Sequence, residues 1–180
     1  MSIRNSYLRF VRLAECTHIP AYQTPGAAGL DVYAARPSPA HPWRPCRGER
    51  RAVESAEQIV DIAPGDRLLV PIGVRVAVPA GYELQIRPRS GLAMRHGLTV
   101  ANSPGTIDSD YRGPVGVLLV NHGRASVPIR PGDRIAQMVL APVARAIMHE
   151  QAELTGTTRG GGGWGSTGGV NEAAGRPDSQ

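Results

Sequence analysis

Residues 105–113 read Gly-Thr-Ile-Asp-Ser-Asp-Tyr-Arg-Gly, and the apolar run Val-Gly-Val-Leu-Leu-Val follows at 115–120. Pro104-Gly105 and Gly113-Pro114 supply turn signals on either side. The pattern predicts a β-hairpin with arms at 105–111 and 114–120. The first arm carries a carboxylate, Asp108, and an aromatic ring, Tyr111. Such a carboxylate can take a proton from water, and the hairpin backbone can pair with the edge of a nucleobase.

Short apolar or alternating runs recur along the chain, separated by Pro-Gly turn signals at a spacing of about ten residues. They are residues 8–13, 30–35, 58–62, 67–70, 74–78, 82–87, 98–101, 114–120, 127–130 and 134–140. This spacing predicts an all-β sandwich or barrel. One helix is predicted at 90–96, with Ser90 as N-cap and Gly97 as its end. A weaker helical pattern covers residues 144–154.

The composition fits one soluble domain. The chain has 180 residues with 22 glycines and 16 prolines, which favours short elements and tight turns. No apolar run approaches the ~18 residues of a membrane span, and the N-terminus has no signal-peptide core. We therefore expect a cytoplasmic protein without a membrane partner. The two cysteines make no disulfide framework, and the histidines lack metal-ligand spacing.

The formal charge of +5 suggests nucleic acid, but the basic residues form no stripe along the chain. A nucleic-acid partner is therefore not expected. All 20 basic residues are arginine. Without lysine, any phosphate clamp must use arginine or backbone amides.

Two segments differ from the rest. Residues 36–57 hold four prolines and five arginines with almost no periodicity, which predicts a surface loop or disordered insertion.

Residues 156–180 are glycine-rich. Among the glycines stand a guanidinium group that can bind phosphate, an aromatic ring that can stack on a base, and two hydroxyl groups. These are Arg159, Trp164, Ser166 and Thr167. The segment can order on a ligand, but it is not a Walker loop, because the lysine is missing and no helix follows.

Three further segments carry polar groups among apolar neighbours. Arg89, Ser90 and Gly91 stand where a strand leads into the predicted helix, and a helix N-terminus attracts anions. Asp31 and Gln137 each stand alone in an apolar strand. Taken singly, each segment has an ordinary structural explanation. Residues 89–91 can be a plain strand-to-helix junction, Asp31 a paired or edge acid, and the neighbours of Gln137 part of the core.

Taken in order, five segments resemble the motifs of the trimeric deoxyuridine triphosphatases (dUTPases). They read AGLDVYAA (28–35), PRSGLA (88–93), GTIDSDYRG (105–113), RIAQMV (134–139) and RGGGGWGSTG (159–168). The resemblance implies a jelly-roll-like β subunit of the β-clip type at residues 1–155 and a mobile arm at 156–180. It also implies a homotrimer with three active sites at subunit boundaries. The implied reaction hydrolyses dUTP to dUMP and pyrophosphate with Mg²⁺ on the triphosphate. It removes dUTP from the nucleotide pool and supplies dUMP for dTMP synthesis.

The resemblance also implies roles for single residues. Asp108 would activate water, and Tyr111 would pack on the deoxyribose and exclude a 2′-hydroxyl. The uracil readers would be Asn102, Thr106, Ile107, Asp108 and Gly116. The phosphate contacts would be Arg89, Ser90, Gly91 and Gln137, with Arg159, Ser166 and Thr167 closing over the γ-phosphate of a neighbouring subunit's site. Trp164, where the family usually has phenylalanine, would stack on uracil. Asp31 would support the water shell of Mg²⁺, which would have no direct protein ligand.

Other functions remain open at this point. A dCTP deaminase-like enzyme would have the same fold and phosphate site. A non-catalytic nucleotide-sensing protein could also use this scaffold. The Ser-Asp-Tyr-Arg continuation at 109–112 and the glycine-rich arm favour the triphosphatase.

Overall fold

The computed structural model describes residues 7–46 and 59–163. Its strands are β1 (Arg9–Arg12), β2 (Leu30–Tyr33), β3 (Arg44–Pro45), β4 (Val60–Ile62), β5 (Arg67–Ala77), β6 (Tyr82–Arg87), β7 (Leu98–Val100), β8 (Gly105–Ile107), β9 (Pro114–Asn121), β10 (Val127–Ile129) and β11 (Arg134–Pro142). Within the described residues the only helix is α1 (Ser90–His96). The chain divides into two units between Ala144 and Arg145, and the strands and α1 all belong to the first.

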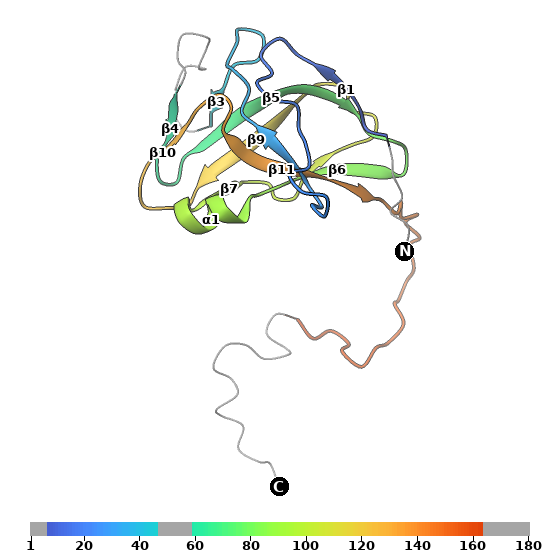
Figure 1. Ribbon diagram of the computed structural model, residues 1–180. Coiled ribbons are helices and arrows are strands. Elements are labelled where there is room, and N and C mark those ends of the chain that lie inside the picture. The colour runs from blue at the N-terminus through green and yellow to red at the C-terminus, as the bar shows by residue number, and fades with distance from the viewer. Residues whose placement is uncertain (1–6, 47–58, 164–180) are drawn as a thin grey trace. The chain divides into compact units, whose positions relative to one another are not determined.

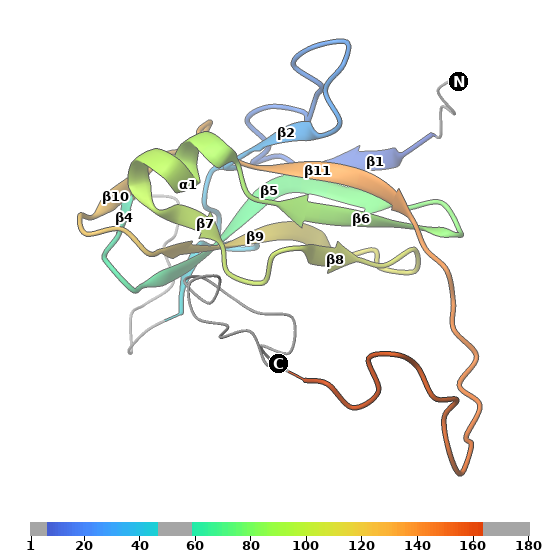
Figure 2. The ribbon, with the colours of Figure 1, turned by 90° about the horizontal axis from the view of Figure 1, so that it is seen from below.

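The strands form two larger antiparallel sheets and one small one (Figures 1 and 2). One sheet has the order β1-β5-β9-β7, with β3 added to β5, and the other has the order β2-β11-β6-β8. Strands β10 and β4 pair separately. In both views α1 lies beside β7. The predicted all-β class with a single short helix is confirmed.

A core of aliphatic side chains lies between the sheets. Val70 of β5, Val117 of β9 and Leu84 of β6 are fully buried, and Met138 of β11 is 2% exposed. Burying such a side chain contributes about 1.5–3 kcal/mol. These residues come from both larger sheets, so the core joins them into the frame that carries the polar residues described below.

Strand β5 joins two runs that the sequence suggested as separate strands. The predicted break at Pro71–Gly73 is instead a shift in register within one strand, between Pro71 and Arg75 in the pairing with β9. Gly73 has φ +73°, and a Cβ there would lie 2.5 Å from the Cα of Cys16. The glycine therefore permits a close backbone approach in mid-strand.

The expectation of a loop or disordered insertion at 36–57 is corrected for its first part, residues 36–46. Strand β3 pairs with β5, with Arg44 opposite Leu69. Trp43 is fully buried, and its Nε1 donates to the carbonyl of Ala35 at 3.1 Å. A large buried ring and a paired strand outweigh the high proline content here. Residues 47–57 lie outside the described part of the chain.

Helix α1 is bounded as predicted, with one difference. Gly97 ends it in the left-handed conformation at φ 66°, but the N-cap is Arg89, and Ser90 is already the first helical residue. The weak helical pattern at 144–154 is wrong, because this stretch contains no helix. Its apolar side chains Ile147 and Met148 are 96% and 92% exposed. A short helix without a buried face is marginal in water. No helix in the described residues has the length and apolar character needed to cross a membrane.

Candidate active site

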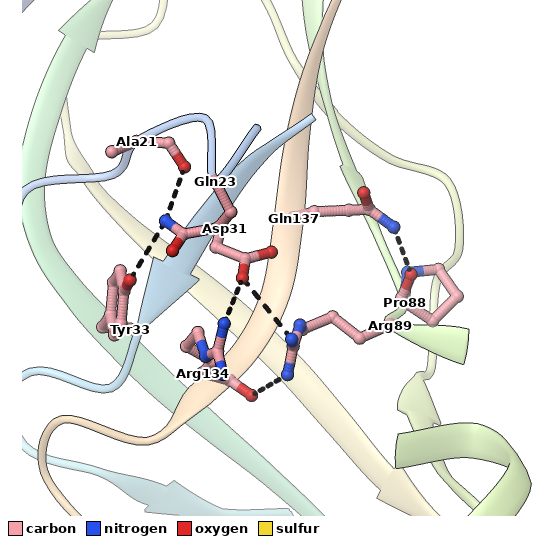
Figure 3. A network of polar contacts seen from close by, with 8 residues as sticks. All are labelled: Ala21, Gln23, Asp31, Tyr33, Pro88, Arg89, Arg134 and Gln137. Carbon is pink, nitrogen blue, oxygen red and sulfur yellow. Dashed lines mark hydrogen bonds and ion pairs between the residues drawn. The ribbon is translucent and has the colours of Figure 1, made fainter. Parts of the chain in front are cut away.

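Two arginines meet one carboxylate at the start of β11 (Figure 3). Arg89 Nη2 and Arg134 Nη1 lie 3.4 and 3.3 Å from the same oxygen, Oδ2 of Asp31. Arg89 also donates to the carbonyl oxygen of Arg134 at 3.3 Å. The Asp31 side chain is only 13% exposed, whereas those of Arg89 and Arg134 are 26% and 47% exposed. The acid thus holds two guanidinium groups that still reach solvent, an arrangement suited to an anion with several oxygens.

Gln137 lies on β11, the strand that begins with Arg134. It stands opposite Asp31 in β2 and opposite Arg87 in β6. Its Nε2 donates to the carbonyl of Pro88 at 2.9 Å, just before Arg89. A Cβ at residue 29 would lie 2.6 Å from Oε1 of Gln137, so Gly29 leaves room for the amide. We call Asp31, Arg89, Arg134 and Gln137 the phosphate-site group, after the phosphate contacts that the resemblance implies for Arg89 and Gln137.

Sequence reasoning missed Arg134. The sequence predicts it only as the first residue of an apolar strand. Two signals were available. Arg134 lies three residues before Gln137 in the same segment, and a chain without lysine must bind phosphate with arginine or backbone amides. Ser90 and Gly91 stand at the predicted strand-to-helix junction, although Ser90 is the first helical residue and not the N-cap. They open α1, where backbone N–H groups have no acceptor within the helix.

The predicted hairpin at 105–120 is wrong in its pairing. Strand β8 pairs with β6, with Ile107 opposite Leu84, and β9 pairs with β5 and β7. The two arms therefore belong to different sheets, and residues 108–113 connect the sheets. The pairing of β8 with β6 is a long-range choice that the local pattern of turns and apolar residues does not encode.

The connection nevertheless borders a small, open cavity with several of the predicted residues on its wall. This base-site cavity has a volume of about 180 Å³. Its lining residues are Thr106, Ile107, Asp108, Tyr111, Pro114, Val115 and Gly116. Asn102 is not among the lining residues; its Nδ2 lies 3.1 Å from the position of a Cβ at Gly105, on the neighbouring strand β8. Asp108 is exposed at the rim, so water has access to its carboxylate.

A second cavity, of about 360 Å³, shares Tyr111, Pro114, Val115 and Gly116 with the base-site cavity. Its other wall includes Ala40, His41, Pro42 and Arg44, from the segment read as an insertion. Nδ1 of His41 lies against a carboxylate oxygen of Glu15. The first part of the insertion thus lies beside the predicted site, and no motif in the sequence indicates this position.

Within one chain the phosphate-site group and Asp108 lie far apart along the sheet. Leu84 of β6 faces Ile107, so Asp108 is level with Glu83, six positions before Arg89. At the rise per residue of a β-strand, six positions put roughly 20 Å between the level of Asp108 and that of Arg89. The cavity lined by Arg89 and Arg134 includes none of the residues of the base-site cavity.

The remaining predicted residues belong to the second unit. Arg159 is exposed, and its Nε donates to the carbonyl of Gly162 at 3.1 Å. Trp164, Ser166 and Thr167 lie outside the described residues.

A magnesium site can be tested against the donor groups present. The described residues contain no cluster of three or more His, Cys, Asp or Glu side chains that could hold a metal ion. Asp31 gives one oxygen to two arginines. This donor set fits an ion held by substrate phosphates and water rather than by a protein cage, which is the usual mode for Mg²⁺.

The family model described as dUTPase matches residues 54–168, more than half of the chain. The deoxyuridine 5′-triphosphate nucleotidohydrolase of Dinoroseobacter shibae is 49% identical over 168 residues, covering 93% of this chain and 99% of the relative. The enzyme of the same name from Roseobacter denitrificans is 53% identical over 151 residues, covering 84% and 87%.

Solved structures agree on the fold. A mutant dUTPase of Staphylococcus bacteriophage 80alpha with dUpNHpp superposes with a TM-score of 0.71 at 20% identity, covering 91% of this chain and 99% of the phage chain. A mutant dUTPase from phage phi11 of S. aureus, described with a structural Mg(II) ion, gives 0.64 at 20% identity, covering 82% and 98%. The family match and the near-full-length relatives place this chain in the dUTPase family.

Proposed function

We infer that this protein hydrolyses dUTP to dUMP and pyrophosphate. The observation that carries the inference is the base-site cavity with Asp108 at its rim, in a chain that belongs to the dUTPase family. The reaction removes dUTP from the nucleotide pool and supplies dUMP for dTMP synthesis.

The base-site cavity selects the nucleotide. The backbone of residues 106–108, Gly116 and the amide of Asn102 pair with the edge of uracil. Cytosine reverses the donor and acceptor pattern and would leave buried groups unpaired, a strong basis for rejection. The Tyr111 ring packs on the deoxyribose and leaves no space for a 2′-hydroxyl.

Asp108 is the general base. It accepts a proton from a water molecule that attacks the α-phosphorus in line with the leaving pyrophosphate, and such proton transfer typically contributes 10²–10⁴-fold. Arg89, Gln137 and the first backbone N–H groups of α1, at Ser90 and Gly91, bind the phosphates. Arg134 joins them, because Asp31 holds both arginines in place.

Mg²⁺ is the proposed cofactor, bound through the triphosphate, with Asp31 contacting its water shell. When bound, the ion would offset negative charge on the leaving pyrophosphate. Removal of Mg²⁺ with a chelator should lower turnover without unfolding the protein, because the described residues offer no structural metal cage.

The proposed assembly is a homotrimer with active sites at subunit boundaries. A dUTP molecule whose α-phosphorus lies near Asp108 cannot also place its phosphates on Arg89 of the same chain, since these residues are roughly 20 Å apart along β6. A second copy of the chain supplies the missing half. Residues 156–180 are proposed as an arm carrying Arg159, Trp164, Ser166 and Thr167 to a neighbouring site. The proposed location is the cytoplasm.

One assay tests this function: pyrophosphate release from dUTP, dCTP, dTTP and UTP, with and without Mg²⁺. We expect release from dUTP alone among the four, enhanced by Mg²⁺. Ammonia release from dCTP would instead identify a deaminase. Binding of dUTP without any product would identify a nucleotide sensor. Light scattering in solution should give the mass of three chains.

A further inference from the structure

Gly113 leaves room for the ring of Tyr111. A Cβ at residue 113 would lie 2.4 Å from the Tyr111 hydroxyl oxygen, 2.6 Å from Cζ and 3.0 Å from Cε2. Carbon atoms in contact stay about 3.5–4.0 Å apart. The ring therefore occupies the space that any other residue at position 113 would fill with its own side chain.

The backbone does not require this glycine. Gly113 is not among the glycines with positive φ, so its φ suits ordinary residues. The need for glycine is thus set by the neighbouring ring.

The ring is 43% exposed but is held at its hydroxyl end. Its hydroxyl donates to the carbonyl of Pro114 at 2.9 Å, and the Tyr111 N–H donates to the carbonyl of Asp108 at 3.2 Å. Nη1 of Arg112 donates to the carbonyls of Ser109 and Tyr111, both at 2.7 Å. The loop is therefore braced from within, and a displaced ring must turn about its own side-chain bonds.

The cavities show what that displacement would affect. Tyr111 lines both the base-site cavity and the cavity beside it, whereas Gly113 lines neither. Gly113 therefore lies against the ring without contributing to the wall of either cavity. A side chain at residue 113 would displace the ring, which is itself part of the wall of the volume proposed for the nucleotide.

We propose that Gly113 is a positioning residue that sets the depth of the sugar pocket, by allowing the Tyr111 ring to seat against residue 113 and the Pro114 carbonyl. The proposal rests on the proposed function, because it assigns the pocket to the sugar of dUTP. Gly113 touches no reacting atom and acts only through Tyr111.

The test is a double-mutant cycle in the full-length protein, with Gly113→Ala, Tyr111→Ala and the combined variant assayed for dUTP hydrolysis. We expect Gly113→Ala alone to raise KM for dUTP about tenfold or more with a smaller change in kcat, because the pocket is reshaped and the base is untouched. In the Tyr111→Ala background the same substitution should change KM by less than about twofold, because no ring remains to be displaced.

Additive effects of the two substitutions on KM would overturn the proposal, and so would an unchanged KM in Gly113→Ala. Thermal unfolding of each variant checks the fold, and a Gly113→Ala that fails to fold while Gly113→Ala/Tyr111→Ala folds would support the proposed clash. If the unmodified protein released no pyrophosphate from dUTP, the proposed function would fail. If it did so and the cycle were additive, only the role of Gly113 would fail.

Discussion

Asp31 of β2 stands directly opposite Gln137 of β11 in the antiparallel register. Side chains at opposed positions lie on the same face of a sheet, so an acid and an amide far apart in sequence share one surface. Arg134, earlier on β11, and Arg89, after β6, both reach that acid. The sheet register, more than any local motif, thus assembles the phosphate-site group.

The charge of Asp31 can be tested by Asp31→Asn, which preserves side-chain size. Arg89 and Arg134 both lose their ionised partner. Because a hydrogen bond to a charged group is worth about 1.5–3 kcal/mol, KM for dUTP should rise about tenfold or more. Steady-state kinetics measure this. Asp61→Asn, at an exposed position on β4, is the matched control. An unchanged KM in Asp31→Asn would remove Asp31 from the site.

Asp108→Asn separates binding from chemistry. The amide cannot act as a base, so kcat should fall by about 10²–10⁴-fold. The affinity for a non-hydrolysable imido analogue of dUTP, measured by calorimetry, should stay within about threefold, because the backbone contacts of the base-site cavity remain. Asp110→Asn, an exposed acid in the same connection, should keep full turnover. Near-normal kcat in Asp108→Asn would exclude it as the base.

Trp43 tests whether the start of the insertion belongs to the core. Because the ring is fully buried, Trp43→Ala should lower the free energy of unfolding by about 3–5 kcal/mol. Trp43→Phe should cost less, since it keeps most of the apolar contact and loses the bond to Ala35. Urea unfolding gives both values, with Tyr22→Ala as the exposed aromatic control at 54% exposure. A loss below 1 kcal/mol for Trp43→Ala would be at odds with its burial.

The role of the C-terminal segment can be tested by deletion. Removing residues 158–180 takes away Arg159 and the last motif while leaving every described strand and α1 intact. We expect an unchanged oligomeric mass and kcat/KM for dUTP lowered about 100-fold, as for a closing element that positions substrate. Removing only residues 169–180, beyond the motif, should leave kcat/KM unchanged. Full activity after the longer deletion would show that the segment is only a linker.

The sequence predicted those features that are encoded locally. Gly97 ends α1 because its left-handed conformation suits glycine, and alternating apolar residues marked the main strands. Features set by distant partners were missed. The pairing of β8 with β6, the approach of Arg134 to Asp31 and the pairing of β3, next to Trp43, with β5 each depend on segments far away in sequence. The pattern at 144–154 failed for the opposite reason, since a helical period without a surface to pack on gives little stability.

The roughly 20 Å between Asp108 and the level of Arg89 on one chain has a genetic consequence. Two variants that are each inactive, Asp108→Asn and Arg89→Ala, should complement one another when co-expressed. In the proposed homotrimer, every mixed ring of three then contains one boundary where an intact acid meets an intact arginine. Random assortment of equal amounts should therefore restore about a quarter of the parental specific activity. No recovery in verified mixed rings would mean that the acid and the arginine of one chain serve the same catalytic centre.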